Sequence, residues 1–338
     1  MALQPADLLR PVTEGLCCPP GGFFVDPVRP VERAVITHGH ADHARAGHKH
    51  VLATPETLAI MAVRYGENFA ESVQPLPYGE TVTVDGVKVK LVPAGHVLGS
   101  AQAVVEKDSL RMVVSGDYKR RRDPTCPEFE PVPCDVFITE ATFALPVFRH
   151  PDTAGEVDKL LASVRRFPER AHVVGVYALG KAQRVIRHIR EAGYDKPLYI
   201  HGALRKLCDL YEEHGIDLGP LEPATVERGR KGDFAGAIIL GPPSAFADKW
   251  ARRFPDPVAA FCSGWMRIRA RARQRGVELP LIISDHADWD ELTDTVREVA
   301  PGELWITHGR EDALALWAQT QGIPAKALSL VGYEDENE

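Results

Sequence analysis

The stretch THGHADH, residues 37–43, constrains the fold of this chain more than any other part of the sequence. It follows the apolar run RAVI directly, so four protonatable side chains stand where a buried strand ends: His38, His40, Asp42 and His43. Polar groups beside a core cost free energy unless they have partners. Two interpretations therefore stay open. These side chains bind a metal, or they form an exposed loop that is rich in histidine.

Three further polar side chains follow strand-like runs elsewhere in the chain. His96 follows LVPAG, Asp117 follows RMVVSG, and His308 ends LWITH. A single histidine at such a place is more often structural than functional. Three of them together with the cluster favour a metal site, because imidazole nitrogen and carboxylate oxygen are ligands that zinc and manganese accept.

The order of strand-like and helical runs predicts a mixed α/β chain. Residues 81–92 alternate around Asp85-Gly86, which indicates a hairpin, and residues 101–117 indicate another around KDS. Helical periodicity covers 154–167 and 180–193, and between 170 and 262 strand-like and helical pieces alternate, as in a parallel sheet. The last 58 residues predict strand, helix, strand and helix. We expect a β-rich domain that is interrupted by an α/β domain and then resumed.

Composition narrows the class of protein. The chain has 338 residues, of which 44% are hydrophobic and 26% charged, as in ordinary globular proteins. No apolar run approaches the roughly 18 residues of a membrane helix, and residues 1–15 lack the pattern of a secretion signal. Six cysteines show no C-x-x-C spacing, which argues against a zinc knuckle or a disulfide framework. We expect a cytoplasmic protein without membrane partners.

Charge is distributed unevenly along the chain, although the net charge is −7. Residues 145–280 hold 23 Lys and Arg against 16 Asp and Glu, whereas the remainder holds 17 against 31. A basic segment suits a polyanion, and the acidic remainder, which contains the histidine cluster, suits divalent cations. The other interpretation is that this asymmetry has no function, since charge patterning is only a weak guide.

The motifs THGHADH, AGHVLGS, SGDYK, SDHAD and ITHG, in that order, resemble the metallo-β-lactamase fold and, more narrowly, its β-CASP nucleases. The segments FFVDPVRPVERAVITHGHADHA, TEATFALP and ALGKAQR further resemble the bacterial DNA-ligase-associated exonuclease group. The resemblance implies an αββα sandwich with an inserted α/β β-CASP cap domain. The sandwich would comprise residues 1–145 and 276–338, and the cap residues 146–275.

The resemblance also implies a set of site residues. Two divalent ions would be bound, zinc in the first place and manganese as the alternative. One ion would be held by His38, His40 and His96, the other by Asp42, His43 and His308, with Asp117 bridging them. Asp26 would orient the ligand histidines, as carboxylates behind metal ligands commonly do. Glu140 and His286 would complete the catalytic set with Asp42 and Asp26.

The implied reaction is phosphodiester hydrolysis by a hydroxide that two metals activate. His286 would protonate the leaving oxygen, with Glu140 supporting its charge. The alternative for His286 is a surface position beside a helix that begins at Asp285 or Asp288.

The basic segment supplies candidate phosphate-binding residues, because arginine contacts phosphate through two N–H groups. Residues 264–275 read GWMRIRARARQR and contain five arginines. Any single arginine there could instead belong to a solvated surface, and Trp265 could stack on a base or lie in a core. The predicted phosphate-binding residues are Lys181, Arg184, Ser263, Gly264 and Arg267.

The function implied is a DNA exonuclease in DNA repair, with an ATP-dependent DNA ligase and a helicase as expected partners. An RNA-processing β-CASP ribonuclease is the first alternative, since histidine at position 308 resembles the RNA-cutting members. A small-molecule metallohydrolase such as a lactonase is the second, and a non-catalytic nucleic-acid-binding subunit the third. The basic segment of more than 100 residues argues against the small-molecule alternative.

Overall fold

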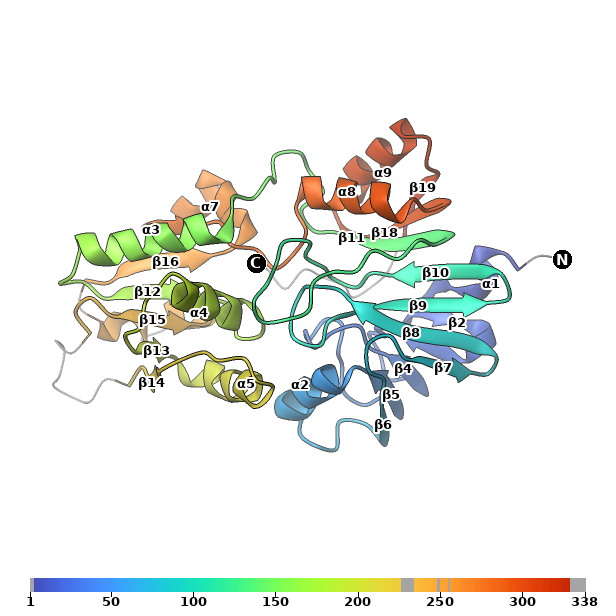
Figure 1. The fold of residues 1–338 in the computed structure, drawn as a ribbon, viewed down its shortest axis with the longest axis horizontal. Coiled ribbons are helices and arrows are strands. Elements are labelled where there is room, and N and C mark those ends of the chain that lie inside the picture. Colours follow the sequence, from blue (N-terminus) through green and yellow to red (C-terminus); the bar gives the residue numbers. More distant parts are fainter. Residues whose placement is uncertain (1–2, 226–233, 248–249, 255, 329–338) are drawn as a thin grey trace. The chain divides into compact units, whose positions relative to one another are not determined.

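The computed structural model describes residues 3–225, 234–247, 250–254 and 256–328, with the backbone alone for residues 247, 252 and 308. The chain forms two compact units. The first unit comprises Met1–Arg149 and His286–Asn337, and the second comprises His150–Asp285. The chain therefore leaves the first unit once and returns to it (Figure 1).

Two sheets form the centre of the first unit. The first sheet has the order β1-β2-β3-β4-β5-β6, and the second has the order β19-β18-β11-β10-β9-β8-β7. The strands of the first are β1 (Arg10–Val12), β2 (Gly15–Cys18), β3 (Phe23–Val25), β4 (Arg33–Val35), β5 (His50–Ala53) and β6 (Ser72–Pro75). Those of the second are β7 (Thr81–Val84), β8 (Val87–Pro93), β9 (Ala101–Lys107), β10 (Leu110–Val114), β11 (Val136–Ala141), β18 (Glu303–Gly309) and β19 (Ala325–Ala327).

Buried side chains arrange this unit in four layers. Between the sheets, Leu16 and Val35 of the first pack with Val89, Val105 and other residues of the second. The outer face of the second sheet is covered by α8 (Trp289–Val299) and α9 (Glu311–Thr320), and that of the first by α2 (Pro55–Tyr65). Figure 1 shows α8 and α9 over β11 and β18. The expected αββα sandwich is confirmed.

The hairpins predicted around Asp85-Gly86 and KDS are also confirmed. Strands β7 and β8 pair antiparallel with Val84 opposite Val87, and β9 and β10 pair with Lys107 opposite Leu110. Asp85 and Gly86 have φ of 46° and 81°, the left-handed pair that a two-residue hairpin turn needs.

The second unit is built on a parallel sheet, as the alternation of elements predicts. Its order is β14-β13-β15-β12-β16-β17. The strands are β12 (His172–Gly175), β13 (Leu198–Ile200), β14 (Leu221–Pro223), β15 (Ile238–Gly241), β16 (Val258–Cys262) and β17 (Leu279–Leu281). The longer helices are α3 (Thr153–Arg166), α4 (Lys181–Glu191) and α5 (Gly202–Glu213), and shorter ones are α6 (Pro243–Ala247) and α7 (Arg269–Gln274).

The return to the first unit lies later than the expected domain boundary between residues 275 and 276. Strand β17 comes after that position, yet it pairs with β16 in the parallel sheet of the second unit. The structure makes the change between Asp285 and His286. The pairing partner of a short apolar run such as LPL is set by tertiary packing, which its own letters do not reveal.

Within the described ranges, no helix is long and apolar enough to cross a membrane.

Trp305 on β18 lies in the core between the two sheets and is 1% exposed, so its substitution tests how much this core stabilises the fold. Trp305→Ala removes the largest fully buried side chain of that core and leaves a cavity, so we expect the free energy of unfolding to fall by about 3–5 kcal/mol. Urea unfolding measures this change. Leu316→Ala on α9, where the side chain is 64% exposed, should change it by less than about 0.5 kcal/mol. Equal losses in the two variants would contradict this assignment of the core.

Candidate metal centre

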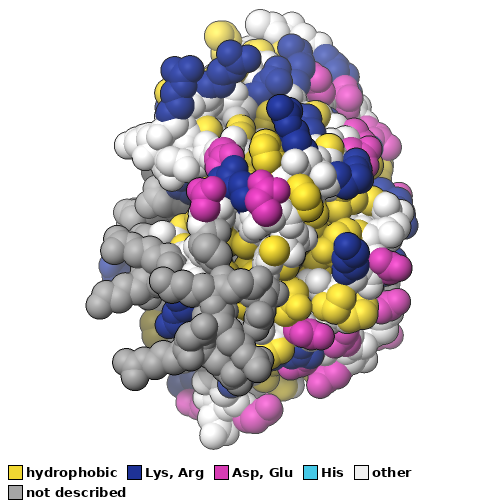
Figure 2. Space-filling view, turned by 90° about the vertical axis from the view of Figure 1, so that its left-hand side faces the viewer, with side chains coloured by type: hydrophobic (Ala, Val, Ile, Leu, Met, Phe, Trp, Pro, Cys, Tyr) yellow, Lys and Arg dark blue, Asp and Glu magenta, His cyan; other side chains and the backbone are white. Residues whose placement is uncertain are grey.

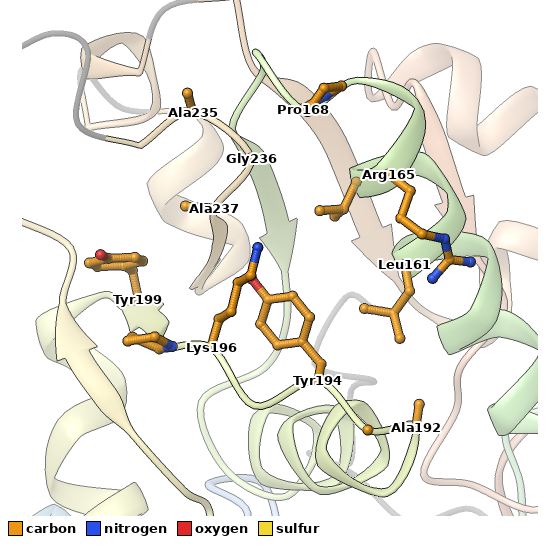
Figure 3. Close-up of a pocket in the computed structure, with 13 residues that line it drawn as sticks. Leu161, Arg165, Pro168, Ala192, Tyr194, Lys196, Tyr199, Ala235, Gly236 and Ala237 are labelled. Atoms are coloured by element: carbon orange, nitrogen blue, oxygen red, sulfur yellow. The ribbon is translucent and has the colours of Figure 1, made fainter.

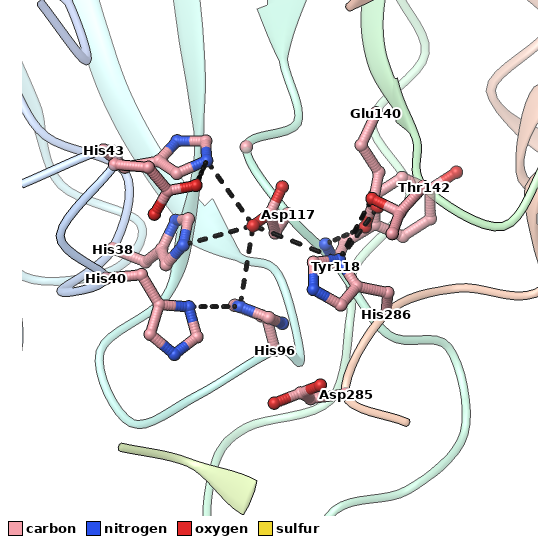
Figure 4. Close-up of polar contacts among 12 residues, drawn as sticks. His38, His40, His43, His96, Asp117, Tyr118, Glu140, Thr142, Asp285 and His286 are labelled. Carbon is pink, nitrogen blue, oxygen red and sulfur yellow. Dashed lines mark hydrogen bonds and ion pairs between the residues drawn. The ribbon is translucent and has the colours of Figure 1, made fainter. Parts of the chain in front are cut away.

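The histidine cluster lies just beyond β4, where the chain turns away from the first sheet. Ile36 still donates to Leu52 O, so extended pairing continues to the edge of the cluster. The backbone N–H groups of His43 and Ala44 then both donate to His40 O, which forms a tight turn. This turn brings the His43 ring back beside that of His38 (Figure 4). Asp42 Oδ2 lies 3.5 Å from His43 Nε2.

Asp117 is the common neighbour of the predicted ligands. Its Oδ2 lies 3.4 Å from His38 Nε2, 3.4 Å from His43 Nε2 and 3.8 Å from His96 Nε2. His96 Nε2 also lies 2.9 Å from His40 Nδ1, so two ring nitrogens converge on one point. Three groups of potential ligand atoms share Asp117, namely His38-His40-His96-Asp117, Asp42-His43-Asp117 and Asp117-Glu140-His286.

Glycines permit the close approach of the strand ends that carry His96 and Asp117. Gly116 has φ of +57°, and a Cβ there would lie 2.7 Å from Thr37 Oγ1. Gly95 has φ of +73°, and a Cβ there would collide with the carbonyl oxygen of Lys119. Only glycine satisfies both the backbone conformation and the space at these two positions.

Asp26 fixes the cluster from behind. Its backbone is left-handed, with φ of 45°, a conformation that aspartate tolerates better than most residues. The buried carboxylate accepts from Thr37 N at 2.7 Å and Thr37 Oγ1 at 2.6 Å, and Oδ2 contacts His43 Nδ1 at 2.8 Å. The imidazole of His43 is therefore held with Nε2 directed at Asp117. Burial opposes a charge on His43, yet the surrounding carboxylates, Asp117 first, raise its pKa to about 10.

His38 has the properties of a metal ligand. Burial, and after it the charge of neighbouring His43, lowers the pKa of His38 to about 4, so its ring is neutral near pH 7. Nδ1 contacts Thr37 Oγ1 at 3.1 Å, whereas the buried Nε2 has no hydrogen-bond partner in the part of the chain that the structure describes. A buried nitrogen lone pair without a partner costs free energy, which a bound cation would remove. The residues present fit a divalent ion.

Glu140 and His286 form a pair on the other side of Asp117. The buried Glu140 accepts from Tyr118 N at 2.9 Å through Oε1, and Oε2 contacts His286 Nδ1 at 2.9 Å. His286 Nδ1 lies 4.0 Å from Asp117 Oδ2. His286 also precedes α8, whose N-cap is Asp288 with a capping box to Glu291. The helix thus begins at Asp288, and the imidazole lies within the cluster (Figure 4).

The predicted phosphate-binding residues lie in the second unit and differ in exposure. Arg267 is exposed, whereas Ser263 and Gly264 are buried, with Ser263 Oγ accepting from Trp265 N at 3.2 Å. Lys181 and Arg184 are buried on α4 and contact other groups of this unit. Trp265 is 9% exposed, and the Arg271 guanidinium lies 3.7 Å from its ring centre. Figure 2 shows lysine and arginine side chains gathered on part of one face.

The side chain of His308 lies outside the described residues, so its predicted place among the ligands stays a prediction. Three neighbours of the cluster were not singled out from the sequence. Thr37 joins Asp26 to His38, Tyr118 N fixes Glu140, and Lys119 Nζ donates to His286 O at 2.9 Å. Each stands inside a motif that carries a predicted ligand, THGHADH or SGDYK.

A separate pocket of about 560 Å³ lies in the second unit (Figure 3). Its lining includes Tyr194, Lys196 and Tyr199, together with Leu161 and Arg165 of α3. None of the residues that the sequence predicts for the site lines it. None of the groups of potential metal-ligand atoms found among the described residues lines this pocket.

Residues 23–169 match the metallo-beta-lactamase superfamily, a range that contains all the ligands predicted before His308. This chain carries a metallo-beta-lactamase superfamily domain. A crystal structure of a protein of unknown function from Enterococcus faecalis V583 has a similar fold. The TM-score is 0.54 at 13% identity, and the match covers 81% of this chain and 74% of that one.

Proteins whose names refer to nucleic acids are also similar to this chain. A probable DNA ligase of Opitutus terrae is 28% identical over 319 residues, 94% of this chain and 30% of that protein. Cleavage and polyadenylation specificity factor subunit 3 of Dictyostelium discoideum is 30% identical over 41% of this chain and 19% of its own length. Endoribonuclease YSH1 of Gibberella zeae is 28% identical over 56% and 23%. The chain thus spans less than a third of each of these relatives.

Proposed function

We propose that this protein is a metal-dependent phosphodiesterase, a DNA exonuclease that acts in DNA repair in the cytoplasm. The observation that carries the proposal is the arrangement of two ligand groups around Asp117, with the Glu140–His286 pair beside them. Similarity to a probable DNA ligase over 94% of the chain supports DNA as the substrate. On this proposal an ATP-dependent DNA ligase and a helicase are the partners.

The proposed ion ligands follow the two groups of converging atoms. His38, His40 and His96 would hold one ion, and Asp42 and His43 with His308 the other, and Asp117 belongs to both groups of side chains. Zinc is the proposed metal and manganese the alternative, since mixed nitrogen and oxygen ligands suit both. When bound, two such ions supply acidity to water and neutralise charge on phosphate.

The other site residues act through position and proton transfer. Asp26 holds the His43 imidazole through Nδ1, so Nε2 faces the proposed ion site. Glu140 holds His286 in the same way, and its negative charge stabilises the imidazolium form. A protonated His286 can then deliver a proton to the leaving oxygen. Histidine suits this step because its ordinary pKa lies near neutral pH.

The second unit is proposed to bind the phosphates of the nucleic acid. Residues 145–280 carry 23 Lys and Arg against 16 Asp and Glu. Among the predicted contacts, Arg267 is exposed and can reach a phosphate, and the Ser263-Gly264 turn adjoins it at the end of β16. Binding through such contacts weakens steeply as salt concentration rises.

RNA is the second candidate substrate, because relatives such as Endoribonuclease YSH1 are named for cutting it and because position 308 is a histidine. Metal-loaded protein incubated with matched, end-labelled DNA and RNA strands tests the choice. Stepwise shortening of DNA supports the exonuclease proposal, while cleavage of RNA with DNA untouched overturns it. Rapid turnover of a small ester, with both strands ignored, would favour a small-molecule hydrolase. Binding of a strand without any cleavage would favour a non-catalytic subunit.

Metal removal should destabilise the folded chain. A ligand present at about 100 times its Kd stabilises the state that binds it by about 2.7 kcal/mol per site. We therefore expect the free energy of unfolding to rise by about 2.7 kcal/mol per ion when Zn²⁺ or Mn²⁺ is added to chelator-treated protein at about 100 times its Kd. Urea unfolding with and without chelator measures the difference. His38→Ala should remove part of the gain, and a gain unchanged in this variant would contradict the ligand assignment.

A further inference from the structure

The 282–285 segment leads from β17 to Asp285, and the next residue along the chain is His286. Ile283, Ser284 and Asp285 are buried, and Ile282 is half-buried. Three buried charged side chains of the second unit contact this short segment. They are Glu156 on α3 and Lys181 and Arg184 on the first turn of α4, with exposures of 1%, 0% and 2%.

Lys181 makes the central contact. Its Nζ lies 3.1 Å from Asp285 Oδ1, and the Asp285 side chain is 3% exposed. The ring centre of Tyr177 lies 5.0 Å from the same Nζ. A fully buried ion pair of this kind is costly to desolvate and is therefore weak evidence for stability alone.

Two further contacts hold the backbone of the segment. Arg184 Nη1 donates to the carbonyl oxygen of Ser284 at 2.8 Å. Ile282 N donates to Glu156 Oε2 at 2.9 Å. The segment is thus fixed at its start, at Ser284 and at the carboxylate of Asp285.

We propose that Lys181 and Arg184 are positioning residues, which fix the 282–285 segment and thereby the backbone from which His286 begins. The inference rests on the proposed catalytic role of His286. Their side chains contact the Asp285 carboxylate and the Ser284 carbonyl oxygen. These contacts differ from the phosphate contacts that the sequence predicts for the two residues. A displacement of about 1 Å in a reacting group can cost a hundredfold in rate, so such fixing matters for a proton donor.

The activity of Lys181 variants distinguishes a positioning role of this residue from a phosphate-binding role. Lys181→Met should lower kcat about tenfold or more, while KM and the dependence of KM on salt stay as in the wild type. Loss of a phosphate contact would instead raise KM and flatten its salt dependence. Lys181→Arg should recover part of the kcat. Lys206→Met on α5, which removes an exposed lysine, is the matched control and should leave kcat unchanged.

The double variant Lys181→Met with Asp285→Val separates positioning from stability. Replacing both members of a buried pair by apolar side chains commonly preserves folding. We expect the double variant to regain the unfolding midpoint of the wild type while its kcat stays low. Recovery of kcat together with the midpoint would overturn the proposal, as would a raised KM at normal kcat in the single variant.

Amide hydrogen exchange keeps the inference testable even without cleavage. Residues 282–286 should exchange faster in Lys181→Met than in wild type and in Lys206→Met. Unchanged exchange there would overturn the proposal. If the wild-type protein cuts no nucleic acid, the proposed function fails, and the exchange measurement still decides whether Lys181 fixes this segment.

Discussion

Asp42→Asn and His43→Ala are each expected to lower cleavage by about three orders of magnitude or more. Two metal ions together can stabilise the transition state of phosphodiester cleavage by several kcal/mol. Each 1.36 kcal/mol of this stabilisation changes the rate by a factor of ten. Both side chains come from the same tight turn and offer ligand atoms within 4.8 Å of one of Asp117. His43 Nε2 lies 3.5 Å from Asp42 Oδ2. Initial rates on an end-labelled strand, together with the number of metal ions bound per chain, measure the effect.

Strand binding should survive in the Asp42 and His43 variants, because the proposed phosphate contacts lie in the second unit. Fluorescence anisotropy with a labelled strand checks this. His50→Ala serves as a control, since His50 is an exposed histidine of the first unit, like Asp42 and His43, and its side chain contacts Ser72 Oγ. Full activity in Asp42→Asn and His43→Ala would refute the metal assignment.

His286→Gln carries the second-largest expected effect. A positioned general acid contributes about 10²–10⁴-fold to a rate, so cleavage of a natural phosphodiester should fall within that range. The effect should nearly vanish on a p-nitrophenyl phosphodiester, whose leaving group needs no proton. Parallel kcat measurements on the two substrates test the role of His286, while metal content should remain unchanged.

Glu140→Gln provides the comparison for the His286 variant. It keeps a side chain of the same shape beside Nδ1 but removes the charge that supports the imidazolium. We expect a smaller loss of kcat on the natural phosphodiester than in His286→Gln. An equal loss on both substrates in His286→Gln would contradict proton donation and would point to a structural or ligand role.

Much of the fold follows from local sequence patterns. Asp85-Gly86 specifies its hairpin because two successive left-handed residues match the twist of paired strands. The run Val258–Cys262 is apolar throughout, which suits a strand covered on both faces, and it forms β16 of the parallel sheet. Such signals act between neighbours in the chain, so the sequence displays them directly.

Other features depend on distant pairing and are absent from local patterns. The assignment of β17 to the second unit depends on its register with β16. The burial of Lys181 could not be predicted, because a lysine at the start of a basic helix ordinarily faces solvent. Likewise, Asp26 accepts hydrogen bonds from Thr37 while its own backbone is left-handed. The residues next to Asp26 in the sequence do not predict this conformation.

The candidate site gathers its residues by a simple rule that the sequence does reveal. His96 follows β8 and Asp117 follows β10, each after a glycine that the close approach requires. Polar side chains placed just after buried strands have few structural uses, so several of them together predict a shared site. The mutual distances, and the neighbours Tyr118 and Lys119, needed coordinates.

The return of the chain to the first unit has a consequence for biosynthesis. Strand β11 pairs with β18, whose residues leave the ribosome only after the whole intervening unit has been made. Until then β11 presents an unpaired edge, and the outer face of its sheet lacks α8 and α9. His286 also leaves the ribosome late, so on its proposed role as proton donor a nascent chain would be inactive until translation is nearly complete. Premature termination near residue 149 would release a chain in which the edge of β11 is unpaired and one face of its sheet is uncovered. Such exposed surfaces are prone to aggregate and are targets for chaperones and proteases.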